Sequence, residues 1–299
     1  MNSIPVLGAL VLTGPEWIER QLESIDYPVD NYVLFDNGGK PETKERLEAL
    51  FEKSHPFIKN KVLCHLPSNL GVAAGWNLII KSYMMAPYWI IVNHDVSFSE
   101  GLLKEMGDAA TQNPETGIIS ANAGDFGWGS YDLFLIKDWV VQKVGLFDES
   151  FYPAYCEDTD YMIRAKNNGI KTMAGLNCPI GFSRYLHGET CDYAISGSQT
   201  AKSSASLNEG FTKSKELNLQ RLQKKWGECY LTSPSDFELW LKNKTSKKPY
   251  TSPYDIVHID DNDDEETTRK RKAFASNYHL LGSTSFDLEF VRSKHLGDF

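Results

Sequence analysis

The chain has 299 residues and a formal net charge of −9 at pH 7, with 41% hydrophobic and 24% charged residues. This composition is typical of a globular protein, and no apolar run approaches the roughly 18 to 20 residues needed to cross a bilayer. A negative net charge opposes binding to nucleic acid, whose affinity comes largely from Lys and Arg contacts to phosphate. We therefore expect neither a transmembrane segment nor a nucleic-acid partner.

The N-terminus and the cysteines indicate the compartment. Residues 1–6 lack the basic region and the longer apolar region of a secretory signal. Five cysteines form no C-x-x-C pair and leave one over in any pairing scheme, which argues against a zinc cluster and a disulfide framework. We expect reduced thiols and a cytoplasmic protein.

Hydrophobic periodicity predicts alternating strands and helices over the first third of the chain. Strands are expected over 6–12, 32–35, 62–66 and 88–93, and helices over 16–25, 42–53 and 73–85. Turns rich in Gly, Pro and Asn separate them. This alternation predicts an α/β fold with a mostly parallel sheet and helices on both faces.

The second half of the chain continues this pattern and then changes character. Further strands are expected over 117–121 and 133–136, with helices over 138–144, 158–168 and 207–226. The last of these is long, basic and amphipathic, and we expect it to close the domain.

From residue 242 to 266 the chain turns polar, with two prolines and an acidic cluster, which is typical of a linker. The basic run Arg269 to Lys272 follows that acidic cluster, so the two are expected to neutralise each other on a solvated surface. We predict one domain over 1–230, and a polar linker with a C-terminal extension over 231–299.

Polar clusters follow three of the predicted strands, at Thr13-Gly14, Asp36-Asn37 and Asn93 to Asp95. Ligands of such sheets bind at the carboxyl ends of the strands, so these clusters should gather at one edge. The Asp95 carboxylate would suit a hard divalent cation, which prefers oxygen ligands. An Asp after a strand also serves as a turn former or a helix cap, and the residue alone does not decide.

A second acidic cluster, Glu157 to Asp160, places three carboxylates at the start of a predicted helix. Favourable interaction with the helix dipole is one interpretation. Crowded carboxylates also raise a pKa and so create a general base, which is the other. His187 lies beside a glycine and is either structural or a metal ligand.

Seven segments share their order and spacing with the motifs of a known family. These segments are Leu34 to Gly39 (V-D-N-G-S), Asn69 to Asn77 (N-x-G-x-A-x-G-x-N), Ile91 to Val96 (the L-N-P-D-V version of D-x-D), Val144 to Glu149 (G-x-F-D-E), Tyr155 to Arg164 (F-x-E-D-x-D-L-x-x-R), Tyr185 to Gly188 (a late histidine) and Lys224 to Gly227 (K-W-G). In this the chain resembles glycosyltransferase family 2 and its relatives of the GT-A type, over about residues 4–228.

The resemblance implies a GT-A, Rossmann-like fold and an inverting transfer of a sugar from a UDP-, TDP- or GDP-sugar to an acceptor hydroxyl on a glycan or glycoconjugate. Mn²⁺ or Mg²⁺ would lie on the diphosphate, held by Asp95 and His187. Asp158 would be the catalytic base, with Glu157 beside it. The residues implied on the donor side are Thr13, Gly14, Asp36, Asn69, Gly71, Asn77, Asn93 and His94, and Asp36 would accept a hydrogen bond from the base of the nucleotide.

The chain departs from the family at Asn93, which replaces the first acidic residue of D-x-D and so removes one anionic ligand. This favours an alternative, a nucleotide-sugar-binding protein of GT-A shape that has lost its activity, although the Glu157-Asp158 pair and His187 oppose it. A nucleotidyltransferase is a third possibility. Its glycine-rich phosphate loop with a basic residue is missing after Leu12.

Overall fold

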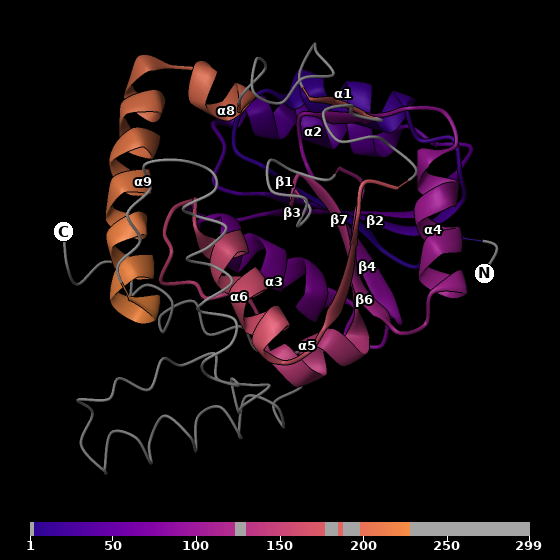
Figure 1. Cartoon of the computed structure of the whole chain (residues 1–299). Helices are drawn as coiled ribbons and strands as arrows, with labels where there is room; N and C mark the ends of the chain where they lie inside the picture. Colours follow the sequence, from indigo (N-terminus) through magenta and orange to yellow (C-terminus); the bar gives the residue numbers. More distant parts are fainter. Residues whose placement is uncertain (1–2, 123–129, 177–184, 188–197, 228–299) are drawn as a thin grey trace. The chain divides into compact units, whose positions relative to one another are not determined.

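The computed structural model describes residues 3–122, 130–176, 185–187 and 198–227 (Figure 1). The predicted linker and C-terminal extension, with the basic run Arg269 to Lys272, lie outside the described residues. The boundary near residue 230 therefore stays a prediction. None of the described helices combines the length and the apolar character that a membrane crossing requires.

A seven-stranded sheet in the order β3-β2-β1-β4-β7-β6-β8 forms the centre of the fold. β7 runs antiparallel to both of its neighbours, and the other adjacent pairs are parallel. The mixed, mostly parallel sheet expected from the sequence is thus confirmed. The strands are β1 (Leu7–Val11), β2 (Val29–Asp36), β3 (Ile58–His65), β4 (Tyr88–Asn93), β6 (Thr116–Ser120), β7 (Leu133–Lys137) and β8 (Lys171–Ala174).

Two short strands form a separate antiparallel pair beside this sheet. β5 (Val96–Phe98) follows β4 after two residues, and β9 (Tyr185–His187) comes from much later in the chain. The register places Val96 opposite His187. The pair therefore joins the segment after β4 to the region of the late histidine.

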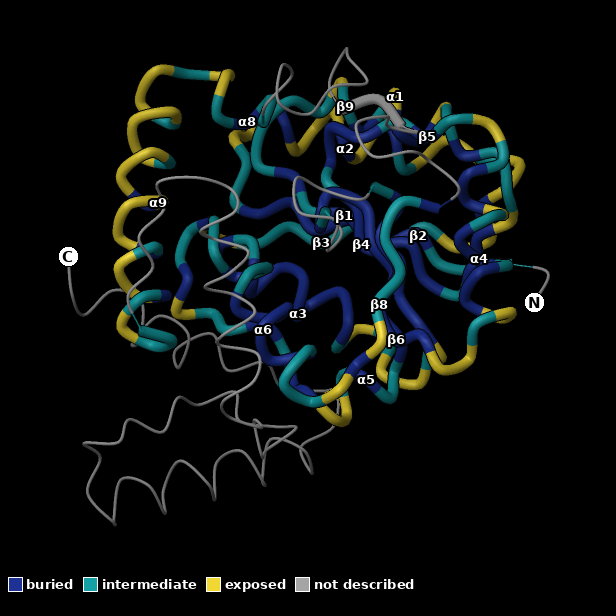
Figure 2. The backbone as a smooth tube through the Cα atoms, viewed as in Figure 1, coloured by how far each residue is buried: buried dark blue, intermediate teal, exposed yellow. Residues whose placement is uncertain are grey.

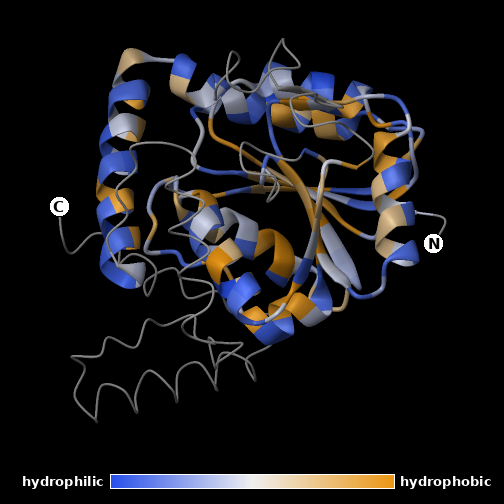
Figure 3. Cartoon of the chain, in the orientation of Figure 1, coloured by the Kyte–Doolittle hydropathy of each residue, from blue (hydrophilic) through white to orange (hydrophobic). Residues whose placement is uncertain are grey.

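Helices cover both faces of the large sheet. The described helices are α1 (Pro15–Glu23), α2 (Pro41–Glu52), α3 (Val72–Ser82), α4 (Leu102–Gln112), α5 (Asp138–Val144), α6 (Glu157–Asn167), α8 (Gln199–Lys202) and α9 (Ala205–Trp226). Apolar residues of α1, α2 and α4 join alternate residues of the central strands in one core cluster. Figures 2 and 3 show that the central strands are buried and hydrophobic, whereas β3 and β8 at the two edges of the sheet are less buried.

α3 packs closely on the opposite face because glycines remove side chains at the contact. A Cβ on Gly75 of α3 would lie 1.7 Å from Cδ1 of Leu10, and a Cβ on Gly8 of β1 would lie 2.3 Å from Cγ2 of Ile79. Any side chain at either position would push the helix away from the sheet. These contacts hold the N-terminus of α3 beside the carboxyl end of β1.

α9 closes the domain through side-chain hydrogen bonds to the segment that leads into α6. The Asn218 side chain donates hydrogen bonds to the carbonyls of Tyr152 and Ala154 at 3.2 and 2.8 Å. Ser214 also donates to the Ala154 carbonyl, at 3.0 Å. Because these carbonyls belong to the chain just before α6, the helix fixes where α6 begins.

The end of α9 is anchored by charge as well. Nζ of Lys225 lies 2.8 Å from both Oδ2 of Asp148 and Oδ1 of Asp160, and Trp226 donates to the same Asp160 oxygen at 2.8 Å. Arg164 donates to the other oxygen of Asp160 at 2.8 Å. Buried charges require such pairing. Lys225 and Trp226 therefore belong to the folded domain.

The order of the strands creates a switch point between β1 and β4. The chain passes from β1 outward to β2 and β3 on one side, and then crosses to β4 on the other side of β1. Connections that leave in opposite directions open a crevice at the carboxyl ends of the two strands.

Candidate functional site

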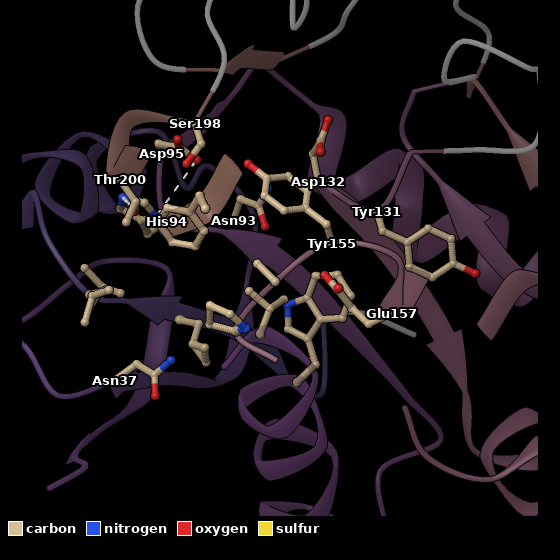
Figure 4. Close-up of a pocket in the computed structure, with 18 of the residues that line it drawn as sticks. Asn37, Asn93, His94, Asp95, Tyr131, Asp132, Tyr155, Glu157, Ser198 and Thr200 are labelled. Carbon is tan, nitrogen blue, oxygen red and sulfur yellow. Dashed lines mark hydrogen bonds and ion pairs between the residues drawn. The ribbon is translucent and has the colours of Figure 1, made fainter. Parts of the chain in front are cut away.

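A cleft lies at this switch point (Figure 4). It is lined by the carboxyl ends of β1 and β4, the segment after β2, the residues before β7, the chain entering α6, and residues of α8 and α9. The polar lining includes Asn37, Asn69, Asn93, His94, Asp95, Asp132, Glu157 and Asp158. Of the three polar clusters expected at this edge, the cluster after β2 contributes Asn37 and the cluster after β4 contributes Asn93 to Asp95, whereas Thr13 and Gly14 are not among the lining residues.

Asp95 lies at the cleft beneath the start of α8. Its Oδ2 accepts a hydrogen bond from the backbone amide of Gln199 at 2.9 Å, and the residue is 2% exposed. His94 lies beside it, with Nδ1 4.0 Å from Oδ1 of Asp95 and Nε2 3.4 Å from Oγ1 of Thr200. Two residues predicted from D-x-D thus lie at the cleft and contact α8.

The β5–β9 pair brings the backbone of His187 close to Asp95. His187 lies opposite Val96, the residue that follows Asp95 in the chain. Among the described residues, no three His, Cys, Asp or Glu side chains converge as a closed metal site would require. A cation at Asp95 would therefore take further ligands from phosphate oxygens and water. Mg²⁺ is usually bound in this way, by one or two carboxylates with phosphate and water. The residues present fit such an open site.

Glu157 and Asp158 form the first turn of α6 and both line the cleft. Oδ1 of Asp158 accepts hydrogen bonds from the amide and the hydroxyl of Thr159 at 2.6 and 3.3 Å. Burial raises the pKa of Asp158, and these hydrogen bonds oppose the rise. Burial and the neighbouring Asp158 charge raise the pKa of Glu157 well above its ordinary value. Two adjacent carboxyl groups with raised pKa values suit proton transfer near neutral pH.

The backbone just before α6 has an unusual conformation. Tyr155 and Cys156 have φ angles of 77° and 72°, and they are the non-glycine residues with positive φ in the described part of the chain. Such conformations cost roughly 1–3 kcal/mol each and persist where the surroundings impose them. The bonds from Ser214 and Asn218 supply that constraint. Sequence reasoning missed this feature because neither residue type signals positive φ.

Asp36 lies at the end of β2 with both carboxylate oxygens engaged. Nδ1 of His65 lies 2.8 Å from Oδ2, and the amide of Gly39 donates to Oδ1 at 2.7 Å. Nε2 of His65 lies 3.3 Å from Oε1 of Glu48. Asp36 is 2% exposed and does not line the cleft, whereas the next residue, Asn37, does. In this structure Asp36 supports the turn that presents Asn37, and its contact with the base of a nucleotide stays a prediction.

Asn37 and Asn69 link the segments that follow β2 and β3. Nδ2 of Asn37 donates to Oδ1 of Asn69 at 2.9 Å, and Oδ1 of Asn37 accepts from the Leu70 amide at 2.8 Å. Gly71 follows with a φ of 86°, and a Cβ there would lie 3.0 Å from the Pro153 carbonyl oxygen. Only glycine fits this position comfortably. The structure thus brings Asn69 to the cleft wall with Asn37, while Gly71 lies between the lining residues Asn69 and Val72 without lining the cleft itself.

The other residues expected on the donor side lie in different surroundings. Thr13 has a buried hydroxyl without a hydrogen-bond partner among the described residues, and Gly14 begins α1 with a φ of 72°. Asn77 is fully buried and does not line the cleft. Its side chain bonds both backbone groups of Phe147, donating at 2.9 Å and accepting at 2.9 Å, and donates to Glu149 at 2.8 Å. Asn77 therefore holds the 145–149 segment on α3 instead of facing a donor.

Several lining residues were not singled out by sequence reasoning, among them Tyr131, Asp132 and Tyr155. Tyr131 is buried, and its ring stacks on Trp76 with centroids 6.3 Å apart. Tyr131 and Asp132 precede β7. Because β7 runs antiparallel, its beginning lies at the edge where the parallel strands end. A search restricted to residues after strands cannot find them.

No protein-family model and no curated protein matches the chain. Among solved structures, it is similar to the mannosyltransferase PcManGT from Pyrobaculum calidifontis in complex with GDP-Man and Mn²⁺, at a TM-score of 0.54 and 12% identity, covering 99% of this chain and 79% of that one. It is also similar to S. aureus TarS 1–349 in complex with UDP-GlcNAc, at a TM-score of 0.50 and 12% identity, covering 82% and 71%.

Identities this low show the fold alone. The mixed sheet with its flanking helices is that of the GT-A glycosyltransferases, so the chain has the GT-A fold that its motifs implied.

Proposed function

We propose that this protein is a glycosyltransferase that moves a sugar from a nucleotide-diphosphate sugar to an acceptor hydroxyl, with inversion at the anomeric carbon. The observation that carries the proposal is one cleft, at the switch point of a GT-A fold, that holds two separate acidic groups. Asp95 follows β4, and Glu157-Asp158 begins α6. Glycosyl transfer needs both, because charge develops on the leaving diphosphate while the acceptor loses a proton.

The donor would lie along the edge formed by the carboxyl ends of β1, β2 and β4. Asn37 and Asn69 line this edge with side-chain amides and carbonyls that suit a nucleotide. We expect a UDP-, TDP- or GDP-sugar. The complexes of PcManGT with GDP-Man and of TarS 1–349 with UDP-GlcNAc support donors of this class.

Asp95 and His187 would hold Mn²⁺ or Mg²⁺ on the donor diphosphate. The backbone pairing that brings the two residues near each other supports this set. When bound, the cation would neutralise the negative charge that develops on the leaving diphosphate. The lining residues among those described include no Lys or Arg, so a cation would be the positive charge in this part of the cleft.

Asp158 would take the proton from the acceptor hydroxyl. Its raised pKa, caused mainly by burial, moves it toward the pH at which a general base works best. Burial and the Asp158 charge raise the pKa of Glu157 well above its ordinary value, so Glu157 would hold its proton more tightly than an exposed Glu does. We expect the acceptor to be a glycan or glycoconjugate.

Calorimetry with UDP, TDP and GDP, each with and without Mn²⁺, tests the donor side. We expect at least one to bind, more tightly with the cation, and Asp95→Ala to remove the enhancement. Equal affinities with and without Mn²⁺ would refute the assignment of Asp95 and His187. Slow hydrolysis of UDP-GlcNAc or GDP-Man with Mn²⁺ would separate an enzyme from a nucleotide-sugar-binding protein that has lost its activity.

A further inference from the structure

The strand pairing around Asn93 places a carboxylate next to the position where D-x-D has lost one. β4 and β7 are antiparallel, with Val92 opposite Leu133. The register continues one step further, since the Asn93 amide donates to the Asp132 carbonyl at 2.8 Å. Directly opposite residues of such a pair point to the same face, with Cβ atoms about 4.5–5.5 Å apart. Asp132 is therefore the cross-strand neighbour of Asn93.

Both residues belong to the cleft. Asn93 and Asp132 line it together with Asp95, and Figure 4 shows all three among its polar side chains. Asp132 is 6% exposed and Asp95 is 2% exposed, so both residues are buried. Asp95 follows β4 and Asp132 precedes β7, so the two carboxylates reach the cleft from neighbouring, paired strands.

The acidic lining of the cleft also indicates that a cation accompanies a bound diphosphate. Four of its described lining residues are acidic, namely Asp95, Asp132, Glu157 and Asp158, and none is Lys or Arg. A diphosphate would enter this surrounding only with a cation that binds carboxylate and phosphate oxygens at once. Asn93 offers a neutral amide oxygen for that purpose, and Asp132 beside it on the neighbouring chain segment offers a carboxylate.

We propose that Asp132 supplies the second carboxylate of the diphosphate-cation site, in place of the one absent at Asn93. The inference rests on the proposed function and deepens it. It resolves the departure from D-x-D, because the anionic ligand moves from β4 to the adjoining strand and is not lost. Asp132 would act directly on the cation or through one of its bound waters.

Exchanging the amide and the carboxylate tests this directly. The variants are Asp132→Asn and the double variant Asn93→Asp/Asp132→Asn, which returns the carboxylate to β4. The measurement is the affinity for UDP and for GDP by calorimetry, with and without Mn²⁺, and the ratio of the two affinities is the enhancement. Affinity without Mn²⁺ reports whether each variant keeps its fold.

We expect Asp132→Asn to lower the enhancement by about 10–100-fold, as loss of a group supporting a metal does. The double variant should recover most of it. Wild-type enhancement in Asp132→Asn, no recovery in the double variant, or no enhancement in the wild type would each overturn the inference. A wild-type protein that binds none of UDP, TDP and GDP would instead overturn the proposed function.

Discussion

The backbone amide of Gln199 donates a hydrogen bond to Oδ2 of Asp95 at 2.9 Å. It joins the first residue of α8 to the carboxylate that follows β4, across 104 positions of the chain. Groups that hydrogen-bond a metal-binding carboxylate fix its orientation. α8 therefore belongs to the support of the cleft, although it has only four residues.

Replacing Gln199 with proline should weaken Mn²⁺-dependent binding of UDP or GDP by about 10–100-fold, because Asp95 loses the donor that orients it. Proline is well tolerated at the first position of a helix, where it lacks only the amide hydrogen. Ser198, with φ −63° and ψ 123°, already has the backbone that precedes proline comfortably. Gln199→Ala keeps the amide and is the matched control. Equal affinities of the two variants, measured by calorimetry, would contradict this role.

Glu157 should make the stability of the protein depend on pH. Burial and the Asp158 charge raise its folded-state pKa well above the ordinary value. The unfolded chain therefore releases this proton at lower pH than the folded chain does. The contribution of Glu157 to stability is fully present below its unfolded pKa of about 4.3 and is lost as pH rises toward and through its folded pKa.

Glu157→Gln removes this loss, because glutamine does not ionise. Relative to wild type, the variant should gain stability between pH 5 and pH 8, with a gain that grows with pH. Urea unfolding midpoints of both proteins at several pH values give the comparison. A difference that stays constant over this interval would mean that Glu157 titrates as an ordinary exposed carboxyl group does.

The Lys225 side chain should contribute strongly to the stability of the domain. Its ammonium group lies 2.8 Å from Asp148 and from Asp160, and removing it leaves both carboxylates short of a partner. Although burial raises the pKa of Asp148, the Lys225 charge lowers it well below the usual range. We expect Lys225→Met to lose about 3 kcal/mol of unfolding free energy.

Lys224→Met is the matched control, since Lys224 is exposed and adjacent. Its effect should stay within about 0.5 kcal/mol. If the two variants unfold at the same urea concentration, the ion pairs at the end of α9 do not stabilise the domain.

Residues after about 245 should be dispensable for folding and for donor hydrolysis. The family-like segments end at Gly227, and the anchoring contacts of α9 end at Trp226. A chain truncated after Lys244 keeps all of them. Soluble expression and the melting temperature of the truncated chain test this, and loss of folded protein would show that the C-terminal extension completes the core.

The sequence predicted the regular elements well where they are long and periodic. The predicted bounds of β4 and α5 agree with the structure, and α9 begins two residues before the predicted start at Leu207. β5, β8, β9 and α8 were missed, because three or four residues do not establish a period. Their places depend on tertiary pairing, such as that of Val96 with His187.

Only part of the cleft lining could be predicted from the sequence. Parallel strands end at one edge, so Asn37 and Asp95 could be expected there from the sequence. Asp132 could not, because nothing in the local sequence tells that β7 runs in the opposite direction. Asn77 shows the opposite error, since a motif position gives no side-chain direction and this side chain points to Phe147.

Asp158 should carry the proton transfer of the reaction. Its carboxylate lies in the first turn of α6, where the helix dipole and the two hydrogen bonds from Thr159 favour the ionised form, while burial raises its pKa. The net effect is a raised pKa, so the Asp158 carboxylate is a stronger base than that of an exposed Asp. General-base assistance is typically worth about 10²–10⁴ in rate, so Asp158→Asn should lower turnover by that factor. Donor affinity should change little, because the site proposed for the cation and the diphosphate is at Asp95 and not at Asp158.

Three measurements check this role together. Steady-state kinetics of Asp158→Asn should show the loss in turnover, and Glu157→Gln should be milder because it keeps the base. The fall of wild-type activity at low pH, which reports protonation of the base, should lie above the ordinary pKa of an Asp and should disappear in Asp158→Asn. NMR of the product should show an inverted anomeric configuration, as attack from the side of Asp158 requires. Near-normal turnover of Asp158→Asn, or a retained configuration, would exclude Asp158 as the base of a single displacement.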